Sequence, residues 1–428
     1  MKIDFVRELA IKILDEIEIK KAYSNIILDE YIRKNKTKLT EKDVGFLSEI
    51  VYGTVMWKLT IDEIIKLHSN IKINKISKWI KYILQIGIYQ IVFLDKVPKS
   101  AAVNESVNLA KKYGMKSSGF VNAILRKVDE KDIERVLEGK DKKEQISIKY
   151  SMPIWIVEEL LKNYKIEVVE EICMQSNKKA KTTIRINKLK TNKEELKQKL
   201  DERKILYKET DMEDFLQINL KNISDLDLFK EGYFTVQDIS AGLASLILNP
   251  QKGQVVLDAC SSPGGKTTYS AELMDNDGII FALDIYEHRL NLVKQNAERL
   301  GIDIIKTEVQ DGTVYNEKFL EKFDRILLDV PCMGLGVIKR KPDIKWQRKK
   351  EDIEEICSIQ KNILKNCSNY LKKGGELVYS TCSILKEENE EVINGFLAEN
   401  KEFKLELEKN ILPTELQDGF YICKLKRI

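Results

Sequence analysis

The sequence predicts a multidomain protein, with an all-α N-terminal domain, a small α+β middle domain and a doubly wound α/β C-terminal domain. Its 428 residues exceed what one ordinary hydrophobic core holds. The first 130 residues or so show apolar residues at helical spacing and no strand pattern. From Gly253 onward, short apolar runs alternate with helical segments, which favours a parallel sheet. We expect domains at 1–140, 141–240 and 241–428.

The N-terminal domain is expected to be a set of amphipathic helices. One helical face near the start is apolar, with Asp4 available as its cap, and consists of Val6, Leu9, Ala10, Ile13, Leu14 and Ile17. Further helices are expected at 41–57, 77–94, 100–113 and 119–128. Gly114 closes the third of these. The charged stretch 129–143 is interpreted as a linker.

The middle and C-terminal domains carry strand patterns. In the middle domain we expect strands at 182–186 and 232–236, a helix that starts at Thr191 with a capping box to Glu194, and a helix at 240–248. In the C-terminal domain we expect strands at 255–258, 279–284, 304–309, 325–329 and 376–380. The helix at 289–300 is ended by Gly301. Ligands of such sheets bind at the carboxyl ends of the strands.

Composition and charge exclude several classes of protein. No run of about 18 apolar residues exists, and the N-terminal residues Met1 to Phe5 lead into a charged amphipathic segment, so we expect a soluble cytoplasmic protein without a membrane partner. Seven scattered cysteines without a CxxC pair, and two histidines, argue against disulfides and a metal site. The net charge of +4 does not by itself indicate nucleic acid. We expect a monomer.

A glycine-rich loop follows the first strand of the C-terminal domain. It comprises Cys260, Ser261, Ser262, Pro263, Gly264, Gly265 and Lys266. Such a turn at the start of a helix places backbone N–H groups where an anionic group can bind. Gly265, Lys266 and Thr267 also match the end of a P-loop, and 326–329 resembles the strand that accompanies one. However, Cys260 occupies the place of the first P-loop glycine, which disfavours a nucleotide triphosphate.

S-adenosylmethionine fits this loop better than a nucleotide does, because it carries a carboxylate and no phosphate. Asp284, about 20 residues past the glycines, ends the second strand and is placed to accept both ribose hydroxyls. Asp311, after the third strand, is placed to contact the adenine amino group. With Asp329, three aspartates follow successive strands, which favours a binding function over three separate loop caps.

Two cysteines are predicted to meet in the same cleft. Cys332 follows the fourth strand and Cys382 follows the fifth, so both lie at carboxyl ends of neighbouring strands. A thiolate that attacks carbon 6 of a cytosine makes carbon 5 nucleophilic enough to accept a methyl group. A carboxyl such as Asp329 near N3 would assist if it holds or shares a proton. A cytosine-C5 methyltransferase is therefore a consistent hypothesis.

These motifs resemble the bacterial ribosomal RNA cytosine-C5 methyltransferases of the RsmB (Sun, Fmu) type. The residues that carry the resemblance are 260–266 (donor loop), 329–332 (D-A-P-C), 381–383 (T-C-S), 341–346 (H-P-D-I-K-W) and 237–240 (Q-D-x-S). Residues 120–127 resemble the antitermination factor NusB. The resemblance implies a NusB-like N-terminal domain, an RNA-recognition-like middle domain and a Rossmann-like class I methyltransferase domain.

The resemblance also implies roles for single residues. Cys382 would be the covalent nucleophile, Cys332 would assist product release, and residues 260–266 with Asp284, Asp311 and Asp329 would contact S-adenosylmethionine. The implied substrate is a cytosine of 16S rRNA, at position 967 in the customary rRNA numbering. Val330, Met333 and Lys341 depart from the usual Ala, Ser and His. These departures surround the chemistry, so they put rate or fit in doubt more than reaction type.

A basic segment follows Cys332 and is expected to contact the RNA backbone and stack on an unpaired base. Its candidate residues are Lys339, Arg340, Lys341, Lys345 and Trp346. The target base must be unpaired or flipped out to reach Cys382. Two alternatives remain open: a P-loop NTPase, and a non-enzymatic RNA-binding assembly factor that keeps the donor fold. The second predicts that Cys382→Ala leaves RNA modification unchanged.

Overall fold

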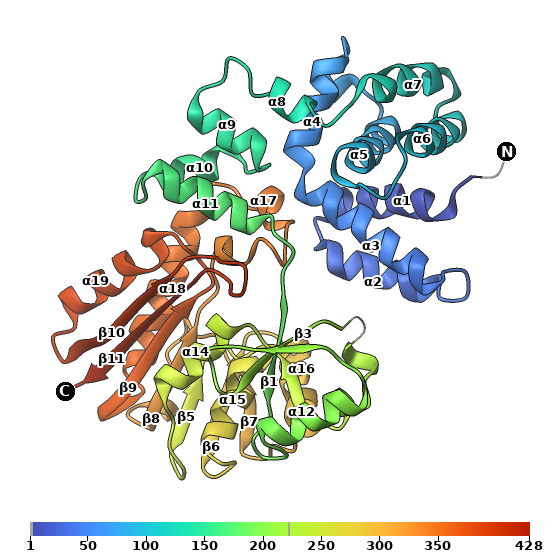
Figure 1. The fold of residues 1–428 in the computed structure, drawn as a ribbon. Helices are drawn as coiled ribbons and strands as arrows, with labels where there is room; N and C mark the ends of the chain where they lie inside the picture. The colour runs from blue at the N-terminus through green and yellow to red at the C-terminus, as the bar shows by residue number, and fades with distance from the viewer. Residues whose placement is uncertain (1–2, 221–222) are drawn as a thin grey trace. The chain divides into compact units, whose positions relative to one another are not determined.

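The computed structural model describes residues 3–220 and 223–428, and the chain forms two compact units (Figure 1). The first unit runs to Asn177 and also includes residues 340–348. The second unit comprises residues 178–339 and 349–428. Met1 and Lys2, where the expected amphipathic N-terminal segment begins, lie outside the described residues. Among the described residues, no helix combines the length and apolar character needed to cross a membrane.

The first unit is helical throughout its described part. Its α-helices are α1 (Phe5–Lys20), α2 (Ser24–Lys34), α3 (Glu41–Met56), α4 (Lys58–His68), α5 (Lys78–Phe93), α6 (Lys99–Tyr113), α7 (Ser118–Lys127), α8 (Asp132–Arg135), α9 (Lys142–Lys149), α10 (Ile154–Leu161), α11 (Ile166–Ser176) and α17 (Ile344–Gln347). Asp4 caps α1 by accepting a hydrogen bond from the Arg7 backbone N–H at 2.8 Å, as the sequence predicts. The apolar faces of α1 and α3 to α7 pack into one core.

The charged stretch 129–143 is more ordered than a linker. It contains α8, and the Asp132 side chain is buried within it. The Asp132 carboxylate accepts a hydrogen bond from Arg135 Nη1 at 2.6 Å and lies 2.7 Å from His68 Nε2 on α4. The contact with His68 anchors the stretch to α4, and both partners supply the hydrogen bonds that a buried carboxylate needs.

The second unit begins with a four-stranded antiparallel sheet in the order β2-β3-β1-β4. Its elements are β1 (Thr182–Ile186), α12 (Lys193–Glu202), β2 (Tyr207–Glu209), β3 (Phe215–Ile218), α13 (Asp227–Lys230) and β4 (Phe234–Val236). The sequence predicts β1 and β4 but not the short strands β2 and β3. The predicted capping box at Thr191 is wrong by one residue. Asn192 caps α12 by accepting a hydrogen bond from the Glu195 backbone N–H.

A seven-stranded sheet forms the rest of this unit, in the order β10-β11-β9-β8-β5-β6-β7. The strands are β5 (Val255–Asp258), β6 (Ile279–Asp284), β7 (Ile305–Val309), β8 (Phe323–Asp329), β9 (Leu371–Thr381), β10 (Phe403–Ile411) and β11 (Phe420–Arg427). Strands β5 to β9 are parallel, whereas β10 and β11 are antiparallel additions at one edge. The predicted doubly wound α/β architecture is confirmed.

Helices cover both faces of this sheet. Apolar residues of α18 (Asp352–Ser368) and α19 (Glu390–Glu399) pack on one face. Apolar residues of α14 (Ile239–Leu248), α15 (Gly265–Leu273) and α16 (Glu287–Leu300) pack on the other. From β5 the chain proceeds outward to β6 and β7, then returns to β8 on the opposite side. The carboxyl ends of β5 and β8 therefore flank the point where strand order reverses, which is where such sheets bind ligands.

Candidate active site

The glycine-rich loop turns sharply between β5 and α15. The Ser261 backbone N–H donates to the Leu283 carbonyl at 2.9 Å, which fixes the loop against the end of β6. Gly264 then adopts a φ of 100°, and a Cβ there would lie 3.1 Å from the Val293 Cα. Both the left-handed conformation and the close approach to α16 require glycine at this position. The loop therefore presents its backbone at the start of α15, as predicted.

A cavity of about 200 Å³, partly open to solvent, lies against this loop. It is lined by Val236, Gln237, Ala241, Asp258, Cys260, Ser261, Ser262, Pro263, Gly265, Lys266 and Asp329. Gln237 Nε2 and Asp258 Oδ1 are buried in the cavity wall, and neither has a hydrogen-bond partner among the described residues. Burial raises the pKa of Asp258 to about 7, although Thr267 Oγ1 donates to its other oxygen at 2.7 Å. Unpaired buried polar atoms indicate a place for a polar ligand.

The three predicted aspartates lie at the carboxyl edge of the sheet. Asp284, which ends β6, is buried, and its carboxylate accepts a hydrogen bond from the Tyr286 backbone N–H at 3.1 Å. Asp311 follows β7 and is exposed, and Thr313 Oγ1 donates to it at 2.7 Å. The Gln310 backbone N–H donates to the Asp284 carbonyl at 3.2 Å, which brings the two segments together.

Asp329, which ends β8, is held by two side chains. Lys266 Nζ donates to Asp329 Oδ2 at 2.7 Å, and Ser380 Oγ donates to Asp329 Oδ1 at 2.9 Å. Burial alone would lower the pKa of Lys266, but the Asp329 carboxylate beside it raises that pKa overall. The pair is thus an ammonium and a carboxylate that share a hydrogen bond at the end of the cavity.

The two predicted cysteines lie side by side. Strands β8 and β9 pair in parallel register with Asp329 opposite Ser380, so the loops that follow them start at the same edge. The Sγ atoms of Cys332 and Cys382 are 2.8 Å apart. The hydrogen bond with Cys382, together with burial, raises the pKa of Cys332 well above its usual range. The raised pKa keeps Cys332 in its thiol form at neutral pH, whereas Cys382 is partly exposed. The geometry alone allows either sulfur to donate in this contact.

The basic segment after Cys332 departs from its predicted exposure. Lys345 is only 1% exposed, and its Nζ donates to Asn177 Oδ1 at 2.6 Å and to the Met56 carbonyl at 3.2 Å. Burial lowers the pKa of Lys345 to about 7. Trp346 Nε1 donates to the Val55 carbonyl at 2.7 Å. Both side chains use these polar atoms to fix the segment within the first unit.

Lys339 is also buried, and its Nζ donates to the carbonyls of Thr414 and Gln417 and pairs with Asp418. Sequence patterning cannot distinguish such internal cations from RNA-binding ones, because both occur in basic stretches. Lys341 differs, since it is exposed and its Nζ lies 5.6 Å from the centre of the Tyr23 ring. Arg340, partly exposed, belongs to the first unit with it.

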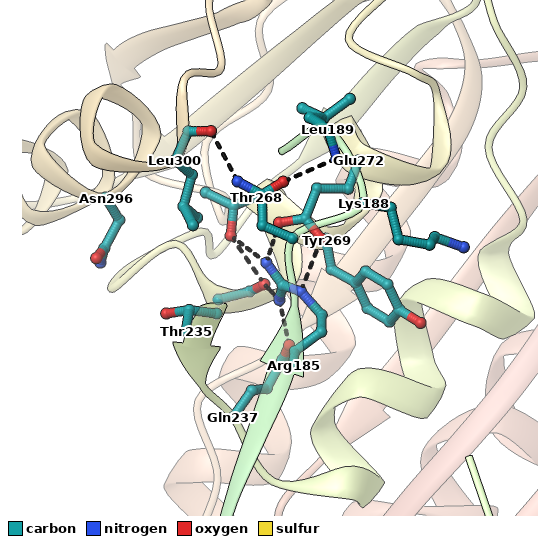
Figure 2. Close-up of polar contacts among 12 residues, drawn as sticks. Arg185, Lys188, Leu189, Thr235, Gln237, Thr268, Tyr269, Glu272, Asn296 and Leu300 are labelled. Carbon is teal, nitrogen blue, oxygen red and sulfur yellow. Dashed lines mark hydrogen bonds and ion pairs between the residues drawn. The ribbon is translucent and has the colours of Figure 1, made fainter. Parts of the chain in front are cut away.

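Figure 2 shows a buried polar cluster near the start of α15. The sequence did not predict this cluster. Arg185 on β1 is fully buried, and its guanidinium pairs with Glu272 on α15, with N–O distances of 2.7 and 3.1 Å. It also donates to the Gly265 carbonyl at 2.8 Å, to Thr268 Oγ1 at 3.1 Å and to Gln237 Oε1. The only sequence signal is an arginine within the apolar strand Thr182–Ile186. The cluster ties the middle domain to the start of α15.

This sheet, with a glycine loop after its first strand and acidic residues at its strand ends, defines a Rossmann-like methyltransferase domain. The family model "16S rRNA methyltransferase RsmB/F" matches residues 245–426, "NusB family" matches 5–130, and "Methyltr_RsmF/B-like, ferredoxin-like domain" matches 152–221. A Bacillus subtilis (strain 168) protein named "Probable ribosomal RNA small subunit methyltransferase B" is 36% identical over the whole of both chains. The chain belongs to the RsmB/F methyltransferase family.

Solved structures agree with this assignment. The crystal structure of PH0851 superposes on the whole chain with a TM-score of 0.82 at 27% identity, and all of that chain is covered. A structure described as a methyltransferase homolog protein from Pyrococcus horikoshii covers 68% of this chain and all of its own, with a TM-score of 0.60 at 27% identity. The NusB-like first domain expected from the sequence is confirmed by its family model, and the expected small α+β middle domain is matched by a ferredoxin-like model.

Proposed function

We propose that this protein transfers a methyl group from S-adenosylmethionine to carbon 5 of a cytosine in small-subunit ribosomal RNA, through a covalent bond between Cys382 and carbon 6. The observation that carries the proposal is the pair of thiols, 2.8 Å apart, which follow the neighbouring strands β8 and β9. Asp329, which ends β8, lines the loop cavity, although neither cysteine does. The cytosine at position 967 of 16S rRNA is the proposed target, and it follows from the resemblance of the motifs.

The residues of the cavity fit S-adenosylmethionine, which when bound supplies an electrophilic methyl group. The backbone of 260–266 suits its carboxylate, and the unpartnered Gln237 Nε2 adds a donor on the same wall. Asp284 and Asp311 are proposed to contact the ribose hydroxyls and the adenine amino group. Among the described residues, the buried Asp284 carboxylate accepts a hydrogen bond from the Tyr286 N–H and forms an ion pair with the Arg289 guanidinium at 3.4 Å, which leaves acceptor capacity for hydroxyls.

Cys382 supplies the nucleophile in this proposal. In this proposal Cys382 attacks as the thiolate, the nucleophilic form of a thiol, and the Cys332 S–H group donates to its sulfur. Attack forms the bond from sulfur to carbon 6, while the electron pair of the 5,6 double bond moves into the ring toward N3. Carbon 5 then has enamine character and accepts the methyl group.

Lys266 and Asp329 together can supply the proton that N3 needs. A lone carboxylate has no proton to give. Lys266 Nζ, however, donates a hydrogen bond to Asp329 at 2.7 Å, and its ammonium group carries further protons. Asp329 can thereby accept a hydrogen bond from the amino group of the cytosine, or it can relay a proton from Lys266 to N3. In the final elimination the carbon-5 proton passes to water, its electron pair re-forms the 5,6 double bond, and the carbon–sulfur bond breaks. Cys382 leaves as the thiolate beside the Cys332 S–H group, and N3 returns its proton to the Lys266–Asp329 pair.

Covalent trapping tests the proposal. Cys332→Ala protein is incubated with cellular RNA and S-adenosylmethionine, denatured, and examined for an RNA adduct whose RNA is then sequenced. We expect an adduct at a small-subunit rRNA cytosine, because attack requires Cys382 whereas release requires Cys332.

The double variant Cys332→Ala/Cys382→Ala should yield no adduct. A matched Cys332→Ala/Cys357→Ala variant should retain it, because Cys357 is a buried thiol of α18 whose Sγ contacts the Glu387 carbonyl. An adduct that survives the loss of Cys382 contradicts the nucleophile assignment. Absence of adduct and of methylation in every variant, with RNA binding intact, supports the alternative of a non-enzymatic assembly factor.

Replacement of Asp284 by alanine is expected to weaken binding of S-adenosylhomocysteine about 10- to 100-fold. Hydrogen bonds to a charged acceptor contribute about 1.5–3 kcal/mol, and each 1.4 kcal/mol corresponds to a factor of ten. Isothermal titration calorimetry measures the dissociation constant directly. Asp277→Ala, at an exposed aspartate before β6, is the matched control and should bind normally. Equal affinity of Asp284→Ala and wild type would remove Asp284 from the donor site.

A further inference from the structure

We infer that Glu388 is a positioning residue that holds the Cys332 loop against the Cys382 loop. The inference deepens the proposed function, on which it rests, because it concerns how the two proposed cysteines are kept at reacting distance. Glu388 lies in the short segment between β9 and α19 and is fully buried. It belongs to none of the motifs that predicted the site.

The Glu388 carboxylate joins the residues that directly follow each cysteine. Its Oε2 accepts a hydrogen bond from the Met333 backbone N–H at 2.8 Å, one residue after Cys332. Its Oε1 accepts one from Ser383 Oγ, one residue after Cys382. One side chain thus bridges two loops that are 50 residues apart in sequence. A buried carboxylate is retained in such a place only when its oxygens are paired in this way.

Further hydrogen bonds hold Glu388 itself. Gln360 Nε2 on α18 donates both to Glu388 Oε2 at 3.0 Å and to the Pro331 carbonyl at 2.9 Å, and so grips the Cys332 loop from the other side. The hydroxyl of Tyr379 donates to the Glu388 carbonyl at 2.6 Å. These partners come from α18 and β9, so the position of Glu388 is set by two rigid elements of the domain.

The two loops do not depend on Glu388 equally. The Cys382 loop has a second support, since Thr381 Oγ1 donates to Asn389 Oδ1 at 2.6 Å and Asn389 Nδ2 donates to the Ser383 carbonyl at 3.1 Å. On the Cys332 loop, in contrast, the Met333 backbone N–H donates to Glu388 itself, and the Gln360 amide that donates to Pro331 also donates to Glu388. Loss of the Glu388 carboxylate should therefore displace Cys332 more than Cys382.

This asymmetry makes a specific kinetic prediction. In Glu388→Ala, attack by Cys382 should continue while release, which needs Cys332 nearby, should slow. We expect kcat to fall by about 100-fold, since misplacement of a reacting group by 1 Å costs about that much. The RNA adduct should accumulate without any change at either cysteine. KM for RNA and the dissociation constant for S-adenosylhomocysteine should stay within about twofold of wild type.

Two variants separate positioning from simple loss of folding. Glu388→Gln keeps an oxygen for the Met333 N–H and should restore most of kcat and abolish adduct accumulation. Gln360→Met keeps the volume of the side chain but removes the hydrogen-bond donor to Pro331 and Glu388. It should accumulate less adduct than Glu388→Ala does. Glu391→Ala, at an exposed acid of α19, is the matched control and should behave as wild type.

The experiment compares turnover, adduct yield and S-adenosylhomocysteine binding in these variants beside Cys332→Ala. The inference is overturned if Glu388→Ala has normal turnover. It is also overturned if this variant loses S-adenosylhomocysteine binding, turnover and adduct formation together and Glu388→Gln does not restore them. Those results differ from failure of the proposed function, in which wild type methylates no cytosine and Cys332→Ala traps no RNA. In that case both proposals fall.

Discussion

Cys382→Ala is expected to lower kcat for RNA methylation by about 10⁴- to 10⁶-fold, the size of loss seen when a covalent nucleophile is removed. The alternative thiol, Cys332, lies 2.8 Å away but is buried and holds its proton, so it should not replace Cys382. Serine at position 382 should be nearly as inactive, because a hydroxyl lacks the low pKa that makes a thiol ionise. Transfer of a labelled methyl group from S-adenosylmethionine to RNA measures the rate.

Binding measurements decide what such a loss means. S-adenosylhomocysteine and RNA should bind Cys382→Ala within about twofold of wild type, because the thiol contributes to the bond-forming step and not to the cavity that holds the donor. Cys357→Ala serves as the matched cysteine control. A residual rate within tenfold of wild type would mean that Cys382 is not the nucleophile, and that methylation follows another route.

Arg185→Met is expected to destabilise the second unit by about 3–5 kcal/mol. Arg185 and Glu272 both have fully buried side chains, and removal of one partner leaves the other charge buried without compensation. Other acceptors of the guanidinium would also be left, among them the Gly265 carbonyl and Thr268 Oγ1, the second of which is labelled in Figure 2. The guanidinium further lies 4.6 Å from the centre of the Tyr269 ring, and this contact would also be lost.

The chain offers an internal control for this measurement. All four tryptophans belong to the first unit: Trp57, Trp79, Trp155 and Trp346. Tryptophan fluorescence during urea unfolding therefore follows the first unit, whereas circular dichroism follows both. We expect Arg185→Met to shift the transition of the second unit, seen by circular dichroism, more than the fluorescence transition.

Lys188→Met is the matched variant, because Lys188 lies three residues away, is half exposed and pairs with Asp214 at 3.1 Å. It should cost no more than about 1 kcal/mol, as for other surface pairs. The double variant Arg185→Met/Glu272→Met should recover part of the loss, since it leaves no buried charge alone. If Arg185→Met is as stable as wild type, the cluster makes no net contribution to the free energy of unfolding.

The central strands of the catalytic domain could be predicted because their signal is local. Strands β5 and β6 begin and end where the sequence places them, since each is a short run of apolar residues that ends at an aspartate. In contrast, β10 is a strand rich in charged side chains and largely exposed, so it carries no apolar run to detect. Its strand conformation comes from pairing with β11, whose partner on the other side is β9.

The residues of the proposed site also differ in whether local sequence signals could locate them. The loop 260–266, the three aspartates and the two cysteines could be located from sequence, because each follows a recognisable strand and parallel strands end at one edge. Lys345 and Trp346 were predicted on the RNA side, yet their polar atoms are used within the first unit. Nothing in a stretch of basic residues tells whether a carbonyl from a distant helix will meet a given ammonium group.

Sequence alone thus determined the order of domains and the family, and it predicted the chemistry proposed at the strand ends, through periodicity and short motifs. Tertiary structure alone decided which polar groups are buried together. Arg185 pairs with Glu272, 87 positions away, and Glu388 accepts from Met333, 55 positions away. A buried charge is stable only with partners, and partners that come from distant segments become visible when the chain is folded.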